Sequence, residues 1–265
     1  MVAVVVASGC ASPTPIATPT STVVVTTTTD PATNRNYTDI GVGPYRARGD
    51  VQVGDHARNV AIDSGLHRAY AVTSEHTLDI IDTRTLAHLD TIELDKKFFA
   101  IRPQSITIDP VTHLVYLLGH GRAEALVVID PATFTVTATF PVGRHPQGIA
   151  IDPETRTVFV TDLSGKELTF VDIATRTVGE IPLGEEPSIG VAVDPGTHTV
   201  FVTSGTFGSI TMIDTKTRKV TASRMTEKES SGGRNTQEIA VDLATHEVFV
   251  THDESSKTID VLTPA

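Results

Sequence analysis

An internal repeat of about 43 residues is the feature that most constrains the fold of this chain. Five copies lie between residues 51 and 265, and each contains a short alternating apolar run that ends in aspartate. The five aspartates, which recur every 42 to 48 residues, are Asp63, Asp109, Asp152, Asp194 and Asp242. A unit of this length cannot bury both of its faces alone, so the copies must stack on one another.

Each copy predicts four β-strands. The first strand alternates with period two, as in residues 148–152, Gly-Ile-Ala-Ile-Asp. A third strand ends in an Asp-x-x-Thr turn, as at residues 130–133, and a short, less apolar fourth strand follows. The second strand carries an aromatic ring seven residues after each aspartate, and we expect these rings to pack between neighbouring sheets. The rings belong to Tyr70, Tyr116, Phe159, Phe201 and Phe249.

Four strands per copy and no helical periodicity predict an all-β fold, a β-propeller of five four-stranded antiparallel blades. The fifth copy stops after its third strand, near residue 262. An unassigned strand at residues 50–53 precedes Gly54, just as the fourth strand of blade two precedes Gly143. We therefore expect this N-terminal strand to complete the last blade and close the ring, which removes the open sheet edges.

At this point the repeat resembles the YVTN (YncE-like) family of β-propeller repeats. The resemblance is carried by residues 142–153, Val-Gly-Arg-His-Pro-Gln-Gly-Ile-Ala-Ile-Asp-Pro, and by residues 157–161, Thr-Val-Phe-Val-Thr. It covers residues 51–264 and implies a propeller fold in a family that looks like a set of binding and surface proteins. Rings of this family commonly carry seven blades, whereas five copies are present here. The chain is therefore either a small ring or a fragment of a larger one.

The first residues predict export. Ala7-Ser8-Gly9 stand immediately before Cys10, which is the single cysteine, and this looks like the end of a bacterial lipoprotein signal peptide. A basic segment and an apolar stretch of normal length are missing, so we interpret the start as a truncated signal remnant with Cys10 as the lipidation site. An apolar start with a chance cysteine is the alternative.

Composition then changes to Thr, Pro, Ser and Ala through about residue 29, which predicts a disordered tether. The expected organisation is a signal remnant and tether at residues 1–48, followed by the propeller at residues 49–265. Residues 30–33, Asp-Pro-Ala-Thr, duplicate residues 130–133 and are either a chance match in a Thr-rich segment or the remnant of another blade.

Charge and cysteine content limit the partners. The formal net charge of −11 argues against nucleic acid and anionic membrane surfaces as partners. A single cysteine excludes an internal disulfide framework. We expect an exported monomer without a cofactor or metal. A lipid anchor would hold it at the cell envelope, on the outer face of a bacterial membrane or in the periplasm.

Four of the ten histidines occupy one repeat position, four residues after the strand-ending aspartate, and the third copy carries arginine there. Because they lie a blade apart, they cannot share one metal ion, and we interpret them as structural. The aspartates are expected to accept backbone N–H bonds in tight turns. The residues of this row are His67, His113, Arg156, His198 and His246.

Binding residues are expected in the loops that rim one face of the propeller. The residues just before the innermost strands offer a polar ring around the channel mouth, or they merely hydrate the channel. Two longer connections, at residues 95–103 and 226–236, flank blade one in a closed ring and predict the main recognition surface there. A neighbouring basic group contains His120, Arg122, Arg144 and His145. The predicted binding residues are His56, Arg58, His76, Phe98, Phe99, Arg102, Gln104, Arg122, Arg144, His145, Gln147, Arg234 and Gln237.

The function expected from these features is a binding or scaffolding module for an unknown protein, a glycan or a small anionic ligand. No Ser/His/Asp arrangement, metal-ligand cluster or Gly-rich phosphate loop stands out in the sequence. One alternative is a hydrolase or lactonase-like enzyme that uses a loop carboxylate, and the other is a purely structural envelope protein. The candidate carboxylates of the enzyme alternative are Glu75, Glu124, Asp162 and Asp253.

Overall fold

The structure is a computed structural model. It describes residues 25–29, 36–40, 50–73, 76–96, 102–120, 124–184, 187–205, 208–225, 236–252 and 259–264. The chain divides into two compact units, Met1–Asp50 and Val51–Ala265. Cys10 lies outside the described residues, so its predicted lipidation stays a prediction.

The first unit contains one pair of strands within its described residues. β1 (Val25–Thr29) pairs antiparallel with β2 (Asn36–Ile40). This pair was not expected in a stretch predicted to be a tether. Residues 30–33, whose sequence repeats residues 130–133, lie outside the described residues. Both interpretations of residues 30–33, a chance match and a remnant of another blade, stay predictions.

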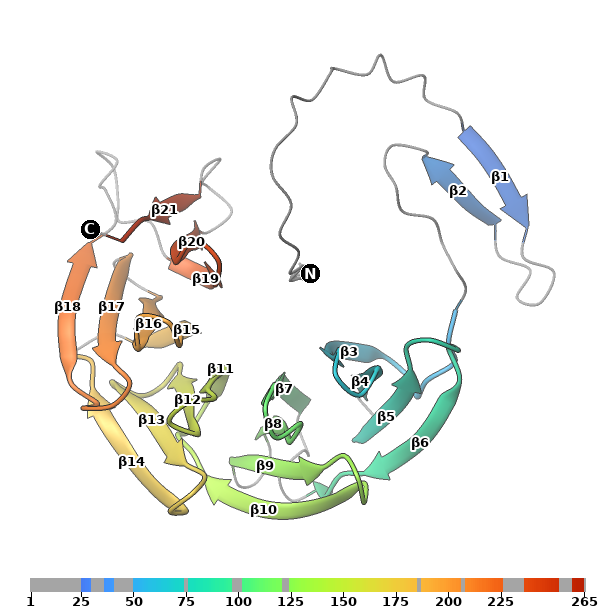
Figure 1. Cartoon of the computed structure of the whole chain (residues 1–265), viewed down its shortest axis with the longest axis horizontal. Helices are drawn as coiled ribbons and strands as arrows, with labels where there is room; N and C mark the ends of the chain where they lie inside the picture. The colour runs from blue at the N-terminus through green and yellow to red at the C-terminus, as the bar shows by residue number, and fades with distance from the viewer. Residues whose placement is uncertain are drawn as a thin grey trace. The chain divides into compact units, whose positions relative to one another are not determined.

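The second unit contains five antiparallel sheets that follow one another along the chain (Figure 1). Sheet 1 contains β3 (Ala57–Asp63), β4 (Arg68–Thr73), β5 (Thr77–Asp82) and β6 (His88–Glu93). Sheet 2 contains β7 (Arg102–Ile108), β8 (Val115–His120), β9 (Ala125–Asp130) and β10 (Thr135–Pro141). Sheet 3 contains β11 (Pro146–Asp152), β12 (Thr157–Asp162), β13 (Glu167–Asp172) and β14 (Thr177–Pro182).

Sheet 4 contains β15 (Ser188–Asp194), β16 (Thr199–Ser204), β17 (Ser209–Asp214) and β18 (Val220–Met225). Sheet 5 contains β19 (Thr236–Asp242), β20 (Glu247–His252) and β21 (Asp260–Leu262). In every sheet each strand pairs with the next one along the chain. The expected all-β fold with strands in this order is confirmed, and sheets 1 to 4 have the expected four strands.

Tight turns with one repeated geometry join the first to the second strand and the third to the fourth. The carboxylate of the strand-ending aspartate accepts backbone N–H groups, as Asp214 Oδ1 does from Lys216 at 3.1 Å and from Thr217 at 2.6 Å. The residue four positions after the aspartate has a positive φ, such as 53° at His67 and 59° at Arg218. The predicted turn role of the aspartates is confirmed, and the histidine row occupies this left-handed position, which histidine adopts more readily than most residues.

Four hydrophobic clusters hold the sheets together, and each cluster joins two consecutive sheets. Tyr70 lies between sheets 1 and 2, Tyr116 between sheets 2 and 3, Phe159 between sheets 3 and 4, and Phe201 between sheets 4 and 5. These four rings are at most 8% exposed, which confirms their predicted packing role. Phe249 of sheet 5 is half-buried and belongs to none of the four clusters.

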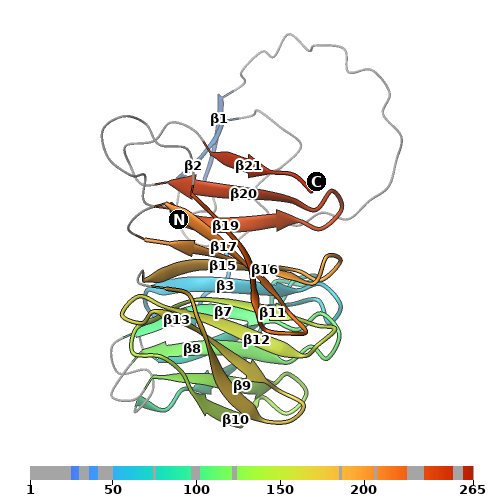
Figure 2. The same cartoon turned by 90° about the vertical axis from the view of Figure 1, so that its left-hand side faces the viewer.

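The expected closure of the ring by residues 50–53 is not found, because these residues form no strand and sheet 5 has three strands in the described part. The Gly54 N–H donates to Asp79 Oδ2 at 3.0 Å, which holds this segment on sheet 1. Sheets 1 and 5 lie at opposite ends of the array, and Figure 2 shows β19, β20 and β21 side by side at one end. A strand requires a neighbouring backbone for its N–H and C=O groups, so residues 50–53 cannot complete a sheet that they do not reach.

Candidate functional site

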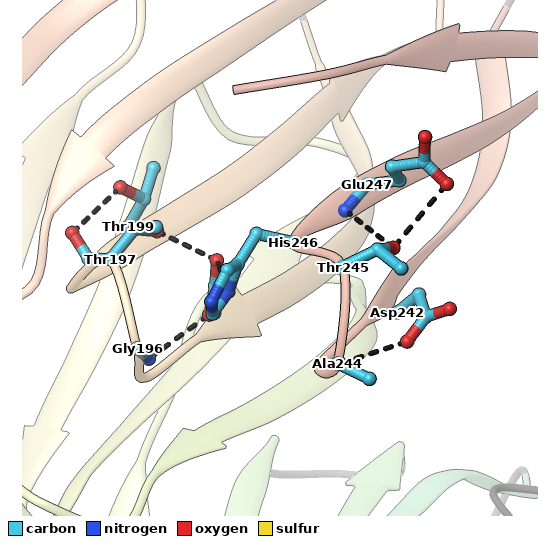
Figure 3. A network of polar contacts seen from close by, with 9 residues as sticks. Gly196, Thr197, Thr199, Asp242, Ala244, Thr245, His246 and Glu247 are labelled. Atoms are coloured by element: carbon cyan, nitrogen blue, oxygen red, sulfur yellow. Dashed lines mark hydrogen bonds and ion pairs between the residues drawn. The ribbon is translucent and has the colours of Figure 1, made fainter. Parts of the chain in front are cut away.

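The histidine row links consecutive sheets. His113 of sheet 2 donates from Nδ1 to Asp63 Oδ2 of sheet 1 at 2.8 Å, and His246 of sheet 5 donates from Nδ1 to Asp194 Oδ2 of sheet 4 at 2.9 Å. Figure 3 shows the His246 ring beside the turn that contains Gly196. These histidines therefore connect sheets, in agreement with their structural interpretation.

In sheets 1, 3 and 4, the residue two positions after the aspartate affects where the histidine of the next sheet binds. Added Cβ atoms at Gly65 and Gly196 would lie 2.6 and 2.5 Å from the histidine Cε1 atoms, so glycine is needed for the ring to reach aspartate. Sheet 3 has Glu154 at this position, and His198 of sheet 4 lies 3.4 Å from Glu154 Oε2 instead. Asp152 Oδ2 has no hydrogen-bond partner within the described residues.

At the other end of the strands, Asp162 organises a polar group that we call the Asp162 site. Its Oδ2 accepts the Arg144 N–H at 2.7 Å, and its Oδ1 accepts the N–H groups of His145 at 3.0 Å and Ser164 at 2.8 Å. Asp162 is 6% exposed. Added Cβ atoms at Gly143 and Gly165 would lie 2.2 and 2.8 Å from Oδ2, so both glycines allow the two loops to approach it.

Four further side chains extend the Asp162 site across the boundary between sheets 2 and 3. His145 Nδ1 is hydrogen-bonded to the Ser164 hydroxyl. The His145 ring is tilted against the ring of His120, with centroids 5.0 Å apart. His120 is 8% exposed, and its Nδ1 lies 3.4 Å from Glu124 Oε1. Arg144 and His145 are exposed, so the site presents cationic and imidazole groups to solvent above a buried carboxylate.

Sheets 3 and 4 support the site from below. Thr161 Oγ1 donates to the Ile189 carbonyl at 2.5 Å, and the Asp162 N–H donates to Ser188 Oγ at 3.0 Å. The Leu163 N–H donates to the His145 carbonyl at 3.0 Å. These bonds join the end of β12 to the start of β15 and to the connection before β11, so the loop that carries Arg144 is fixed on a strand scaffold.

The structure describes the side chains of seven of the thirteen predicted binding residues. Phe98, Phe99, Arg122 and Arg234 lie outside the described residues, and only the backbone of Arg102 and Gln104 on β7 is described. His56 and Arg58 are exposed at the start of β3, and His76 is half-buried next to β5. Gln147 and Gln237 are half-buried on β11 and β19. Within the predicted set, the structure brings together Arg144 and His145.

The residues predicted to ring the channel mouth lie at corresponding positions of the five inner strands. They are Arg58, Gln104, Gln147, Ile189 and Gln237. The carbonyl of Ile189 accepts a bond from Thr161, and the carbonyl of Gln237 accepts the equivalent bond from Thr203 Oγ1 at 3.0 Å. Equivalent inter-sheet bonds support the predicted phase of the repeat. The two long connections are not both adjacent to sheet 1, because one joins sheet 1 to sheet 2 and the other joins sheet 4 to sheet 5.

Sequence reasoning missed part of the Asp162 site. His120 and His145 were named as basic residues, and Asp162 and Glu124 were named as possible catalytic carboxylates. Ser164 was not named, because a serine in a polar loop carries no distinguishing signal. The glycines at 143 and 165 were the available signal for a buried carboxylate, but only the folded loops reveal which carboxylate they approach.

Shifted pKa values lie in the turns and in the core. Backbone N–H and hydroxyl bonds from Thr217 hold the pKa of Asp214 below its ordinary value. Burial raises the pKa of Tyr116 to about 12, so this phenol stays protonated at neutral pH. Burial alone would raise the pKa of Asp79, but bonds from Thr91, His88 and the Gly54 N–H outweigh it and lower that pKa. All three shifts accompany structural hydrogen bonds or packing.

Two further observations concern the described residues alone. They contain no group of three or more His, Cys, Asp or Glu side chains arranged to hold a metal ion. They also contain no helix that is long and apolar enough to cross a membrane.

Solved structures with a similar arrangement of sheets include a β-propeller domain. The chain is similar to hydrazine synthase of Kuenenia stuttgartiensis, with a TM-score of 0.63 and 17% identity over 78% of this chain and 59% of that chain. It is also similar to the β-propeller domain of Cps50 (Swd1) from Myceliophteria thermophila, with a TM-score of 0.66 and 13% identity over 81% of this chain and 72% of that chain. This chain has a β-propeller fold. At these identities the likeness shows the fold alone.

Sequence comparison gives a weaker and shorter match. No protein-family model matches the propeller. The uncharacterized protein YncE of Salmonella typhi is 24% identical over 91 residues, and the match covers 34% of this chain and 26% of that protein. YncE of Salmonella typhimurium matches to the same extent. The matched part spans about a quarter of the length of these relatives. The identity over this part indicates a distant relationship to YncE.

Proposed function

We propose that this propeller is a binding module and that the Asp162 site is its recognition surface. The observation that carries the proposal is the buried Asp162 carboxylate, which accepts N–H groups from Arg144, His145 and Ser164. These bonds fix the backbone of a loop whose Arg144 and His145 side chains are exposed. A loop held in one conformation binds with a lower entropic cost than a mobile loop.

The ligand that this surface favours is a small anion or an acidic glycan that carries carboxylate or phosphate. Arg144 contributes a fork of N–H donors that matches such oxygens, and His145 adds a second donor when it is protonated. No ion pair involves Arg144 among the described residues, so its guanidinium is not neutralised there by a protein carboxylate. The acidic character of the whole protein would then select against large polyanions such as nucleic acid.

Buried Asp162 is unsuited to the alternative hydrolase mechanism, because both of its oxygens already accept backbone N–H bonds. Glu75 and Asp253 lie outside the described residues. Among the candidate carboxylates of that mechanism, Glu124 is described and lies 3.4 Å from His120 Nδ1. We therefore favour binding over catalysis at this site.

The cellular setting is part of the same proposal. An exported propeller that is lipid-anchored through Cys10 would present the Asp162 site at the cell envelope, on the outer face of a bacterial membrane or in the periplasm. The Thr/Pro-rich composition after Cys10 supports a tether of this kind.

The binding proposal is tested by titration of the full chain with inorganic phosphate, acetate and a uronic-acid oligosaccharide, followed by NMR of the histidine Cε1–H signals. We expect at least one of these probes to shift the His145 signal. Replacement of Arg144 by alanine should weaken that binding by roughly tenfold, which is typical of an anchor residue. The affinity should also fall with added salt, since the contacts are charge-assisted.

Lys219→Ala is the matched control, because Lys219 is an exposed cation in the β17–β18 turn at the other end of the strands. It should leave binding unchanged. The proposal is wrong if none of the probes shifts the His145 signal, or if Lys219→Ala weakens binding as much as Arg144→Ala does.

A further inference from the structure

Sheet 1 exposes an apolar surface on β3. In each of the other four sheets, the equivalent surface is covered by the preceding sheet. Val60 and Ile62 on β3 are 59% and 62% exposed, and we call their side of the sheet the leading face. The corresponding residues of sheets 2 to 5 are partly buried against the preceding sheet's cluster. Those residues are Ile106, Ile108, Ile149, Ile151, Val191, Val193, Ile239 and Val241.

Sheet 5 exposes the face that, in sheets 1 to 4, packs against the next sheet. Phe249 pairs in register with Val261, and we call their side of the sheet the trailing face. Val261 is 48% exposed and Phe249 is half-buried, whereas the corresponding ring Phe201 is buried against sheet 5. Four internal junctions therefore join a trailing face to a leading face, and one face of each kind is left at the ends.

Within the described residues, no hydrophobic cluster joins the two end faces of one molecule. Sheets 1 and 5 lie at opposite ends of the array (Figure 1). Exposed apolar surface of this kind is characteristic of an interaction site. Val60 and Ile62 occupy the positions that pack against a trailing face at each internal junction. The surface that fits the leading face best is therefore the trailing face of sheet 5.

We propose that a second copy of this chain docks head to tail, with its trailing face on the leading face of the first. Such a contact is heterologous: it leaves one face free on each molecule, so the copies form short chains, or a ring if the rotation closes. This proposal is independent of the ligand site, because Asp162 lies within sheet 3.

One internal contact cannot form at this junction in its usual way. Ala244 occupies the position that Gly196 has in sheet 4, where an added Cβ would lie 2.5 Å from the ring of the bound histidine. In the docked pair, Ala244 therefore keeps His67 of the second copy from Asp242. The junction is mainly apolar and weaker than the internal junctions, in keeping with reversible association.

Sedimentation velocity of the full chain tests the proposal. The average mass should rise above that of the monomer over about a hundredfold range of concentration. Ile62→Asp damages the leading face and Val261→Asp the trailing face, and each should weaken association by roughly tenfold or more. A mixture of the two variants should form one-to-one pairs, because each variant retains one intact face.

Ala244→Gly provides a gain-of-function test, since it makes room for His67. It should strengthen association, and the added substitution His67→Ala should remove the gain. The control is Val111→Asp, at a position that is 69% exposed in a turn of sheet 2 and should leave association unchanged. Circular dichroism melting checks that each variant is folded.

Three results would overturn the proposal. The chain could stay monomeric at every concentration, it could associate equally well with both end faces altered, or Ala244→Gly could change nothing while Val111→Asp disrupts association. A monomer whose melting temperature falls on Ile62→Asp would show instead that the two end faces meet within one chain.

Discussion

Arg218 of sheet 4 donates from Nη2 to Asp172 Oδ2 of sheet 3 at 2.8 Å, and its guanidinium lies over the Phe170 ring, 4.1 Å from the centroid. One side chain thus joins two sheets by a charge-assisted hydrogen bond and a cation–π contact. The geometry arises because Arg218 occupies the left-handed turn position, with a φ of 59°. The turn directs the side chain across the junction toward sheet 3.

Arg218→Ala is expected to lower the free energy of unfolding by roughly 1.5 to 3 kcal/mol, the range measured for hydrogen bonds to charged groups. Urea denaturation measures the change, with the exposed neighbour substitution Lys219→Ala as the control. Equal urea midpoints for the two variants would contradict the role of Arg218 between the sheets.

Asp172 should make stability depend on acid pH. Burial alone raises the pKa of this carboxyl, but bonds from Thr175 and from Arg218 outweigh it and hold the pKa below its ordinary value. The stabilisation is therefore complete above the unfolded-state pKa of about 4 and is lost as the pH falls through the folded-state pKa. Asp172→Asn should be less stable at neutral pH and should lose less stability below about pH 4. Thermal melting across this pH range tests both parts.

The aromatic rings between sheets should contribute most to the core. Phe159→Ala is expected to cost roughly 3 to 5 kcal/mol, because the ring is fully buried between sheets 3 and 4. Phe249→Ala is the matched comparison and should cost clearly less, since this ring is half-buried at the end of the array. Denaturant titration compares the two variants. A larger loss for Phe249→Ala would show that its face is covered within the monomer.

The effect on stability of replacing the glycine beside an inter-sheet histidine should depend on that histidine. Gly196→Ala places a Cβ 2.5 Å from His246 Cε1 and should displace the ring from Asp194, at a cost of roughly 1 to 3 kcal/mol. In a His246→Ala background the same glycine change should be nearly neutral. A double-mutant cycle measures the coupling. Additive losses would mean that the glycine is required for another reason.

The Asp162 carboxylate should order the loop of the ligand site. Asp162→Ala removes the acceptor of three backbone N–H groups, and amide hydrogen exchange should accelerate at Arg144, His145 and Ser164. The amides of sheet 1 serve as the internal reference and should be unaffected. Unchanged exchange at these three amides would show that other contacts hold the loop.

Cys10 should be the lipidation site of the exported protein, as the likeness of residues 7–10 to a lipoprotein signal implies. Cys10→Ser is expected to move the protein from the membrane fraction to the soluble fraction. A lipoprotein signal of this kind requires a cysteine thiol to accept the lipid. Fractionation and mass spectrometry of the N-terminal peptide provide the measurement. The same fractionation for both forms, without an acyl group on either, would rule out an anchor at this position.

The repeat made the strands, turns and core predictable from the sequence alone. Period-two alternation is a local property of the chain, and so is an aspartate that accepts N–H groups two or three residues away. The aromatic at a fixed distance from each aspartate predicted five core rings. Tyr70, Tyr116, Phe159 and Phe201 are buried, whereas the fifth ring, Phe249, is half-buried.

Tertiary structure alone decided which groups meet across the sheets. His113 reaches Asp63 and His198 reaches Glu154, although both histidines occupy the same repeat position, because a side chain two residues after the aspartate controls access to it. In the same way the buried Asp162 gathers two loops whose sequence distance conceals their contact. The open ends of the array were also unpredictable, since contact between sheets 1 and 5 depends on the rotation accumulated over every intervening junction, and a sequence repeat does not specify that sum.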